Sequence, residues 1–238
     1  MNSFIQKMNN NNQKFKVDEK SLEIVKYLAK EPNKIVTTEN IFEEMKKLGW
    51  KTNYPTVFRK VDSLINQNFI LKEKYGVANR LQLNLNNDMT KLLLSLFEVN
   101  NRDLLLNKLR GSLRINVMKI IESLEINPII KTIIIFGSYA KKKERLNSDL
   151  DLLIICENLS YKKYGKKNIR NEIIQILKTA ELRTNIKFNP IIVNINEYCE
   201  MLKNNENNVG KESLLDHIIL YGEYEYWRGI SKCYQKKN

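Results

Sequence analysis

Two apolar segments, separated by a short polar stretch, constrain this chain more than any other feature. The first, residues 132–136, is β-branched and aromatic and ends abruptly at Gly137-Ser138. The second begins at Asp149 and Asp151, which alternate with leucine, and continues as Leu-Ile-Ile-Cys. Apolar runs of this length and composition predict buried strands. We therefore expect a strand, a tight turn that opens a helix, and a second strand with two acids at its head.

The polar residues beside these strands indicate a particular chemistry. The two-residue period of a strand places Asp149 and Asp151 on one face, where their charges call for a cation such as Mg²⁺. A turn or N-cap role is the alternative for these acids, and their position at the head of an apolar strand argues against it. Gly137 lets the backbone approach a ligand, and the Ser138 hydroxyl and the first helical amides can hold a phosphate oxygen.

The stretch IIIFGSYAKKKERLNSDLDLLII resembles that of the minimal nucleotidyltransferases of the DNA polymerase β superfamily. The similarity extends from residue 129 to about residue 221. It implies transfer of a nucleoside monophosphate from a nucleoside triphosphate, with ATP the expected nucleotide, onto a hydroxyl or phosphate with the help of two Mg²⁺ ions. The residues implied are the catalytic and metal-binding acids Asp149 and Asp151, and the nucleotide-binding residues Gly137, Ser138 and Lys142.

The chain departs from this family at the third acid, which a later strand usually supplies. The strand predicted from NIKFNPIIVNI contains no Asp or Glu, and Asn189 stands where the acid is expected. An amide offers a neutral ligand but no general base. Two outcomes follow: an enzyme with a weaker site completed by Glu197, or a nucleotide or metal sensor without transfer. The family's usual spacer glycine is also absent, with Lys142 near its place.

The N-terminal part of the chain has a different pattern. Apolar residues at helical spacing predict three helices, with Thr37 or Thr38 as a cap, Gly49 as a stop and Pro55 as a first residue. Two strand-like runs follow, on either side of a turn at Tyr75-Gly76. Over residues 18–86, three helices and a β-wing resemble the winged helix-turn-helix of small transcription regulators.

In such a module the third helix enters the major groove of double-stranded DNA. The residues expected to face DNA are Asn53, Tyr54, Thr56, Arg59 and Lys60. The alternative is that these are solvated positions on a module that binds protein, or nothing. The net charge of +13 favours a polyanionic partner, although compositional drift in an AT-rich genome produces the same excess of lysine.

The overall composition bears on membrane spans, on the cysteines and on the single histidine. The chain has 42% hydrophobic and 28% charged residues and no apolar run of about 20 residues, which predicts a protein without a membrane span. The three cysteines are far apart in sequence, in no paired motif, which fits a reducing cytoplasm. His217 lies within the apolar run LLDHIIL, where we expect it to be structural in a helix followed by an aromatic turn.

The sequence thus predicts an α+β protein. Its parts are a disordered tail (1–17), a winged helix-turn-helix domain (18–86), a helical connector (87–127) and a nucleotidyltransferase domain with a mixed sheet flanked by helices (128–238). The apolar surface of the connector also predicts a homodimer contact. The first functional hypothesis is an Mg²⁺-dependent nucleotidyltransferase with a DNA-binding module. The alternatives are a transcription regulator that senses nucleotide, and an interaction protein such as the nucleotidyltransferase half of a toxin-antitoxin pair.

Overall fold

The computed structural model describes residues 17–76, 78–109, 112–145, 148–157, 159, 169–184 and 186–234. The chain divides into two compact units, Met1–Thr90 and Lys91–Asn238. The predicted tail, residues 1–17, lies outside the described residues except for Val17. Each unit is described below by itself.

The first unit contains three helices, as the sequence predicts. Each helix begins at a residue whose side chain accepts a hydrogen bond from a backbone N–H of the first turn, namely Asp18, Thr37 and Asn53. The helices bury one face each, which forms a common core. Their bounds are α2 (Glu19–Lys30), α3 (Thr38–Lys47) and α4 (Tyr54–Asn66).

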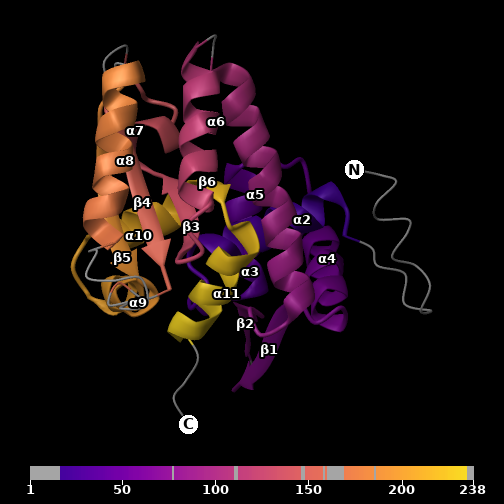
Figure 1. Ribbon diagram of the computed structural model, residues 1–238. Coiled ribbons are helices and arrows are strands. Elements are labelled where there is room, and N and C mark those ends of the chain that lie inside the picture. Colours follow the sequence, from indigo (N-terminus) through magenta and orange to yellow (C-terminus); the bar gives the residue numbers. More distant parts are fainter. Residues whose placement is uncertain are drawn as a thin grey trace, which may run out of the picture. The chain divides into compact units, whose positions relative to one another are not determined.

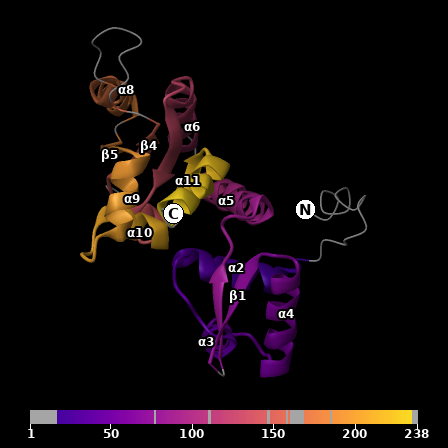
Figure 2. The same cartoon turned by 90° about the horizontal axis from the view of Figure 1, so that it is seen from below.

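A β-hairpin completes this unit (Figures 1 and 2). Strands β1 (Ile70–Tyr75) and β2 (Ala78–Leu83) pair antiparallel. Val36, which lies between α2 and α3, adds an isolated bridge to Leu81 through two backbone hydrogen bonds of 2.9 and 2.8 Å. Both residues are buried, so the bridge ties the hairpin to the helical core.

The second unit is built on a four-stranded sheet in the order β5-β4-β3-β6. Strand β4 runs parallel to β5, whereas β3 is antiparallel to both β4 and β6, which confirms the predicted mixed sheet. The elements are α5 (Asp88–Lys108), α6 (Ser112–Glu125), β3 (Ile130–Ile135), α7 (Gly137–Ala140), β4 (Leu150–Cys156), α8 (Ile169–Thr184), β5 (Phe188–Asn194), α9 (Ile195–Lys203), α10 (Val209–Leu215), β6 (Ile218–Tyr221) and α11 (Glu223–Tyr234).

Helices cover both faces of this sheet. Leu150, Leu152 and Phe188 pack with α6 and α8 in one hydrophobic core. The opposite face meets α9 and α11, and Figure 2 shows the strands between the two groups of helices. Because side chains alternate along a strand, Asp151 and Asn189 belong to the face opposite α6 and α8.

Helices α5 and α6 occupy the segment that the sequence predicts as a connector. They supply several residues to the core beneath the sheet, among them Leu105, Leu106 and Leu124. Leu92 and Leu96 of α5 are exposed. The predicted homodimer contact through this segment stays a prediction, which the oligomeric state in solution tests.

The region around His217 differs from the prediction. Helix α10 ends at Leu215, and Ile218–Tyr221 forms strand β6 on the edge of β3 instead of continuing the helix. The expected aromatic turn is the helix α11. The apolar pattern of a short run does not distinguish a strand from a helix. Here the run forms a strand because it pairs with the otherwise open edge of β3.

The cysteines also depart from what their spacing suggests. Cys199 of α9 and Cys233 of α11 form a disulfide with a Cα–Cα distance of 4.9 Å, across 34 residues of sequence. Packing of α9 against α11 brings them together. Cys156 is free, and burial raises the pKa of its thiol to about 11. In the described part of the chain, no helix has both the length and the apolarity needed to cross a membrane.

Candidate active site

The turn after β3 is shaped by Gly137. Its φ of +68° lies in the left-handed region that glycine adopts without strain. The preceding Phe136 donates its backbone N–H to the Asp151 carbonyl oxygen at 3.1 Å, which fastens the turn to β4. A Cβ atom on Gly137 would lie 2.2 Å from Oδ2 of Asp151. The backbone of the turn therefore lies directly against the Asp151 carboxylate, at a distance that only glycine permits.

The two predicted acids lie at the head of β4. Asp149 precedes the strand and is exposed, and Asp151 is its second residue and is half-buried. Leu150 between them is buried in the core on the α6 and α8 side. The alternation of the strand places the Asp151 carboxylate on the other face, together with the Gly137 turn, and Asp149 lies two residues before it at the head of the strand.

Asn189 is the neighbour of Asp151 on the next strand. The parallel register of β4 and β5 pairs the two residues directly. The Asn189 Nδ2 donates a hydrogen bond to Asp151 Oδ1 at 3.0 Å. The structure thus places an amide donor beside Asp151, at the position where sequence comparison expects an acid.

The lysines that follow the turn differ in their surroundings. Lys141 forms an ion pair with Glu212 of α10, with 2.5 Å between Nζ and Oε1, and this hydrogen bond raises the pKa of Lys141. Lys142 is exposed and has a φ of +55°, a conformation usually reserved for glycine. Lys143 donates its backbone N–H to the Ser138 carbonyl oxygen at 2.9 Å and so closes the turn. Lys142 therefore holds a left-handed backbone conformation that glycine would adopt without strain.

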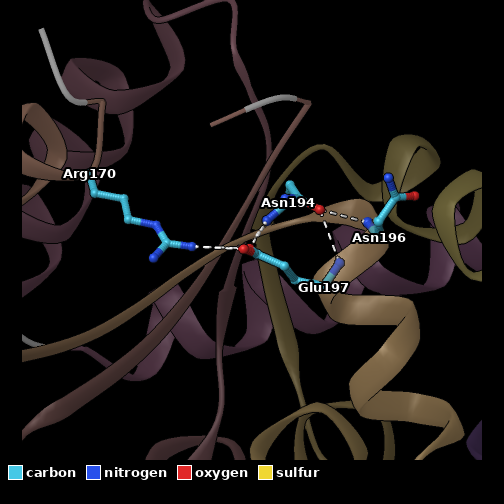
Figure 3. Close-up of polar contacts among 4 residues, drawn as sticks. All are labelled: Arg170, Asn194, Asn196 and Glu197. Carbon is cyan, nitrogen blue, oxygen red and sulfur yellow. Dashed lines mark hydrogen bonds and ion pairs between the residues drawn. The ribbon is translucent and has the colours of Figure 1, made fainter. Parts of the chain in front are cut away.

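Glu197 does not complete this site, so it is not the substitute acid that one of the two alternatives required. Its carboxylate caps α9 by accepting a hydrogen bond from the Asn194 backbone N–H at 2.8 Å, and it forms an ion pair of 3.0 Å with Arg170 (Figure 3). Asn194 pairs with Cys156, five positions along the strands from Asp151. At about 3.3 Å per residue, Glu197 lies at the far end of the sheet, roughly 16 Å away.

Other acids near the sheet are also engaged. Glu181 of α8 accepts a hydrogen bond from the Phe188 backbone N–H at 2.8 Å, on the α8 side of the sheet. Glu212 is paired with Lys141, while Glu144 lies exposed in the segment after α7. Across the described ranges, no three His, Cys, Asp or Glu side chains gather as a metal-binding group. None of the residues outside those ranges is acidic.

These side chains fit a hard divalent cation. Carboxylate oxygens are the protein ligands that Mg²⁺ prefers, and Mg²⁺ commonly takes one or two carboxylates and completes its shell with water and phosphate oxygens. Asp149 and Asp151 supply that number, and Gly137, which has no side chain, lets the backbone of the turn lie beside the Asp151 carboxylate. The donor set is thus suited to Mg²⁺ together with a phosphate ligand.

The residues predicted to face DNA lie in and around α4. The Asn53 side chain caps this helix by accepting a hydrogen bond from the Thr56 backbone N–H at 3.1 Å. Lys60 is paired with Asp18, with 2.5 Å between the charged atoms. Tyr54 and Arg59 are exposed. Arg59 and Tyr54 are therefore exposed, although Arg59 Nε donates a hydrogen bond to the Pro55 carbonyl oxygen at 3.3 Å, and the side chains of Asn53 and Lys60 have partners within the unit.

Phe58 is an exposed residue of α4 that the sequence did not single out. The structure buries Val57 and leaves its neighbour Phe58 46% exposed. Its ring lies 6.4 Å from that of Tyr54, which in turn lies 5.7 Å from Phe42 of α3. The spacing of Val57, Val61 and Leu64 on one helix face would have identified Phe58 as exposed.

The comparisons with known proteins concern the second unit. Residues 118–214 match the family model described as Polymerase beta, Nucleotidyltransferase. A solved structure titled "Crystal structure of the toxin-antitoxin with AMP-PNP" is similar, with a TM-score of 0.31 and 16% identity over 49% of this chain and 83% of that chain. The chain matches no curated protein sequence. The segment that carries the Gly137 turn, both aspartates and Asn189 thus lies within the residues that match the nucleotidyltransferase family model.

Proposed function

We propose that the second unit is an Mg²⁺-dependent nucleotidyltransferase that uses a nucleoside triphosphate, with ATP the expected one. The observation that carries this proposal is the approach of the Asp151 carboxylate to the backbone of the Gly137 turn. It brings a cation-binding group and a backbone that can accommodate phosphate to one place. The match of residues 118–214 to the nucleotidyltransferase family supports the same reading.

In this proposal each residue of the site has a defined task. Asp149 and Asp151 hold the divalent ion, which when bound neutralises charge on the triphosphate and polarises the α-phosphate. Gly137 and Ser138 bind the β- and γ-phosphates, and Lys142 contributes positive charge from the surface. An acceptor oxygen forms the new bond to the α-phosphorus, pyrophosphate leaves, and the acceptor proton passes to solvent.

The test is transfer of label from α-labelled nucleoside triphosphates in Mg²⁺ to candidate acceptors of three classes: RNA ends, proteins and small hydroxyl compounds. We expect labelled product with the wild-type chain and none with Asp149→Ala/Asp151→Ala. Glu197→Gln is the matched control, because it removes one carboxylate at the far end of the sheet. Equal labelling by the wild-type chain and the double variant would exclude the site.

A second proposal concerns the first unit, which we infer binds double-stranded DNA through α4. Three helices followed by a hairpin, with the bridge from Val36 to Leu81, support this proposal, because a winged helix contains the same elements. Arg59, Tyr54 and Phe58 are among the solvent-exposed residues of α4. In such a module, arginine contacts phosphates or guanine, and an exposed phenylalanine can contact thymine methyl groups. The protein would then act as a regulator or bring the transferase to DNA.

Footprinting on the chain's own promoter region, with and without ATP, tests the second proposal. Arg59→Ala should weaken binding and reduce the slope of affinity against salt by about one. Lys34→Ala is the matched control, since it removes a charge that is paired with Glu31 at the end of α2. If the two variants bind DNA alike, α4 is not the DNA-binding element.

A further inference from the structure

The contact between Asn189 and Asp151 points to a property of the site that goes beyond transfer itself. We propose that Asn189 is a positioning residue for Asp151, and that the site consequently binds one divalent cation, through Asp149 and Asp151, in place of two. This inference rests on the proposed nucleotidyltransferase function. It concerns how many ions the site holds and how fast it can work.

The direction of the hydrogen bond carries the first step. Asn189 turns its Nδ2, which bears hydrogens, toward Asp151 Oδ1 at 3.0 Å. An amide nitrogen in this state is a donor and has no lone pair for a metal. A carboxylate at the same position would offer oxygens to a cation held between the two strands. Asn189 therefore stands where a third ligand is expected. The part of its side chain that faces Asp151 is an NH₂ group, which cannot bind a cation.

The second step concerns the orientation of the Asp151 carboxylate. One oxygen accepts the Asn189 hydrogen bond, and the other points to the backbone of Gly137. Oδ1 is thus held by a neighbour on β5, and Oδ2 lies beside the glycine that opens α7. The Asn189 hydrogen bond uses a lone-pair direction of Oδ1 that a bridging carboxylate would need. A carboxylate that bridges two metal ions needs both oxygens free.

The third step is the balance of charge. The two negative charges of Asp149 and Asp151 balance the charge of one divalent cation. Three other acids of the surrounding elements have partners: Glu181 a backbone N–H, Glu212 Lys141 and Glu197 Arg170. Glu144 and Asp216 are exposed, and no contact brings either of them to Asp151 in the described residues. A second cation would rest on the nucleotide alone, beside a run of three lysines. The described residues thus supply protein ligands for one ion.

This arrangement predicts a site that binds the nucleoside triphosphate well and transfers the nucleoside monophosphate slowly. The single ion sits with the triphosphate, and no protein carboxylate is left to draw the proton from the acceptor oxygen. Replacing Asn189 by Asp should supply both the missing ligand and that base. The exposed position of Asn189 makes this substitution compatible with folding.

The experiment counts Mn²⁺ bound per chain, by electron paramagnetic resonance, with a non-hydrolysable nucleoside triphosphate analogue present. We expect one Mn²⁺ for the wild-type chain and two for Asn189→Asp. Asn189→Ala should keep one ion and weaken its binding about tenfold, because Asp151 loses its orientation. Transfer measured alongside should rise at least tenfold in kcat for Asn189→Asp, with a nearly unchanged KM for the triphosphate.

The outcomes separate this inference from the proposed function. Two ions in the wild-type chain, or one ion in Asn189→Asp, overturns the inference and leaves the transferase proposal standing. No nucleotide-dependent Mn²⁺ binding by any variant, including Asn189→Asp, overturns the proposed function itself. Glu144→Gln is the control for the exposed acid after α7, and it should bind the same single Mn²⁺ as the wild-type chain. Loss of that ion in Glu144→Gln would contradict the assignment of the ion to Asp149 and Asp151 alone.

Discussion

At the scale of single residues, Gly137 offers the most direct test of the site. Gly137→Ala should cost about 1–2 kcal/mol of folding free energy from the left-handed backbone. It should also displace the Asp151 carboxylate, which lies 2.2 Å from the new Cβ position. We therefore expect Mn²⁺ and triphosphate affinity to fall at least tenfold, measured by calorimetric titration.

Gly76→Ala separates strain from displacement in that experiment. Gly76 has a φ of +58°, close to the value at Gly137, and a Cβ there meets no atom within 4 Å. This variant should lose similar stability and keep full triphosphate affinity. Unchanged affinity in Gly137→Ala would mean that Asp151 does not contact the ligand.

At Lys142 we predict that a substitution raises the stability of the fold. It holds a φ of +55° without being glycine, which costs about 1 kcal/mol. Lys142→Gly should therefore raise the thermal midpoint by a few degrees in a melting experiment, about what 1 kcal/mol produces in a domain of this size. Lys143→Gly, at a neighbouring lysine without positive φ, should bring no gain. A loss of stability in Lys142→Gly would contradict the positive φ at this residue. A loss of triphosphate affinity in the same variant would instead measure the contribution of the lysine charge to nucleotide binding.

The residues of the site divide into those that sequence could predict and those that it could not. Gly137, Asp149 and Asp151 are predictable because their roles depend on local spacing along one strand and its turn. The role of Glu197 is not local. It depends on β5 running parallel to β4, which carries everything after Asn189 away from Asp151. That direction is set by how α8 crosses the sheet, and no short stretch of sequence encodes it.

At the scale of elements, the helices of the first unit were predictable because each has a cap and an amphipathic stripe. Strand β6 was not, since its four residues are all apolar or aromatic and carry no period. Only its pairing with β3 defines it. Local signals were therefore sufficient for capped helices and insufficient for an edge strand that is buried on both faces.

Helix α5 is held to β6 and α11 by charged contacts. Arg102 bonds the Leu220 carbonyl oxygen and the Glu223 carboxylate at 3.2 and 2.5 Å. Glu98 lies 3.4 Å from His217 Nε2, and both side chains are buried. Burial lowers the pKa of His217, but the Glu98 carboxylate outweighs it, so the net effect raises that pKa above its ordinary value.

The Glu98–His217 pair predicts a pH dependence of folding. A raised folded-state pKa means that the pair stabilises the fold fully below the unfolded histidine value of about 6.5. The contribution is lost as pH rises from there through the folded pKa. We expect the melting temperature to fall over that interval in the wild-type chain and to vary less in His217→Gln. Breaking the buried pair should itself cost about 3 kcal/mol at acidic pH. Melting curves that are parallel at every pH for the two proteins would exclude the pair as their source.

At the scale of the whole molecule, the chain is organised as two units with separate cores. The core beneath the sheet draws on residues from Leu105 to Leu220 and on none from the first unit. The helices and hairpin before residue 90 bury their own apolar side chains. Both units carry more Lys and Arg than Asp and Glu. The positive charge therefore does not tell which unit binds a polyanion such as DNA.

Separate cores predict separable activities. A fragment of residues 87–238, which retains all of α5, should fold and bind Mn²⁺ and triphosphate within about twofold of the full chain, because every proposed ligand lies in it. The same fragment should lose DNA binding, which the proposal assigns to α4. The double variant Asp149→Ala/Asp151→Ala in the fragment is the control for nonspecific nucleotide binding by its lysines. A folded fragment that no longer binds triphosphate would show that the first unit completes the nucleotide site. In that case α4 would have to be tested as a substrate-binding element and not only as a DNA reader.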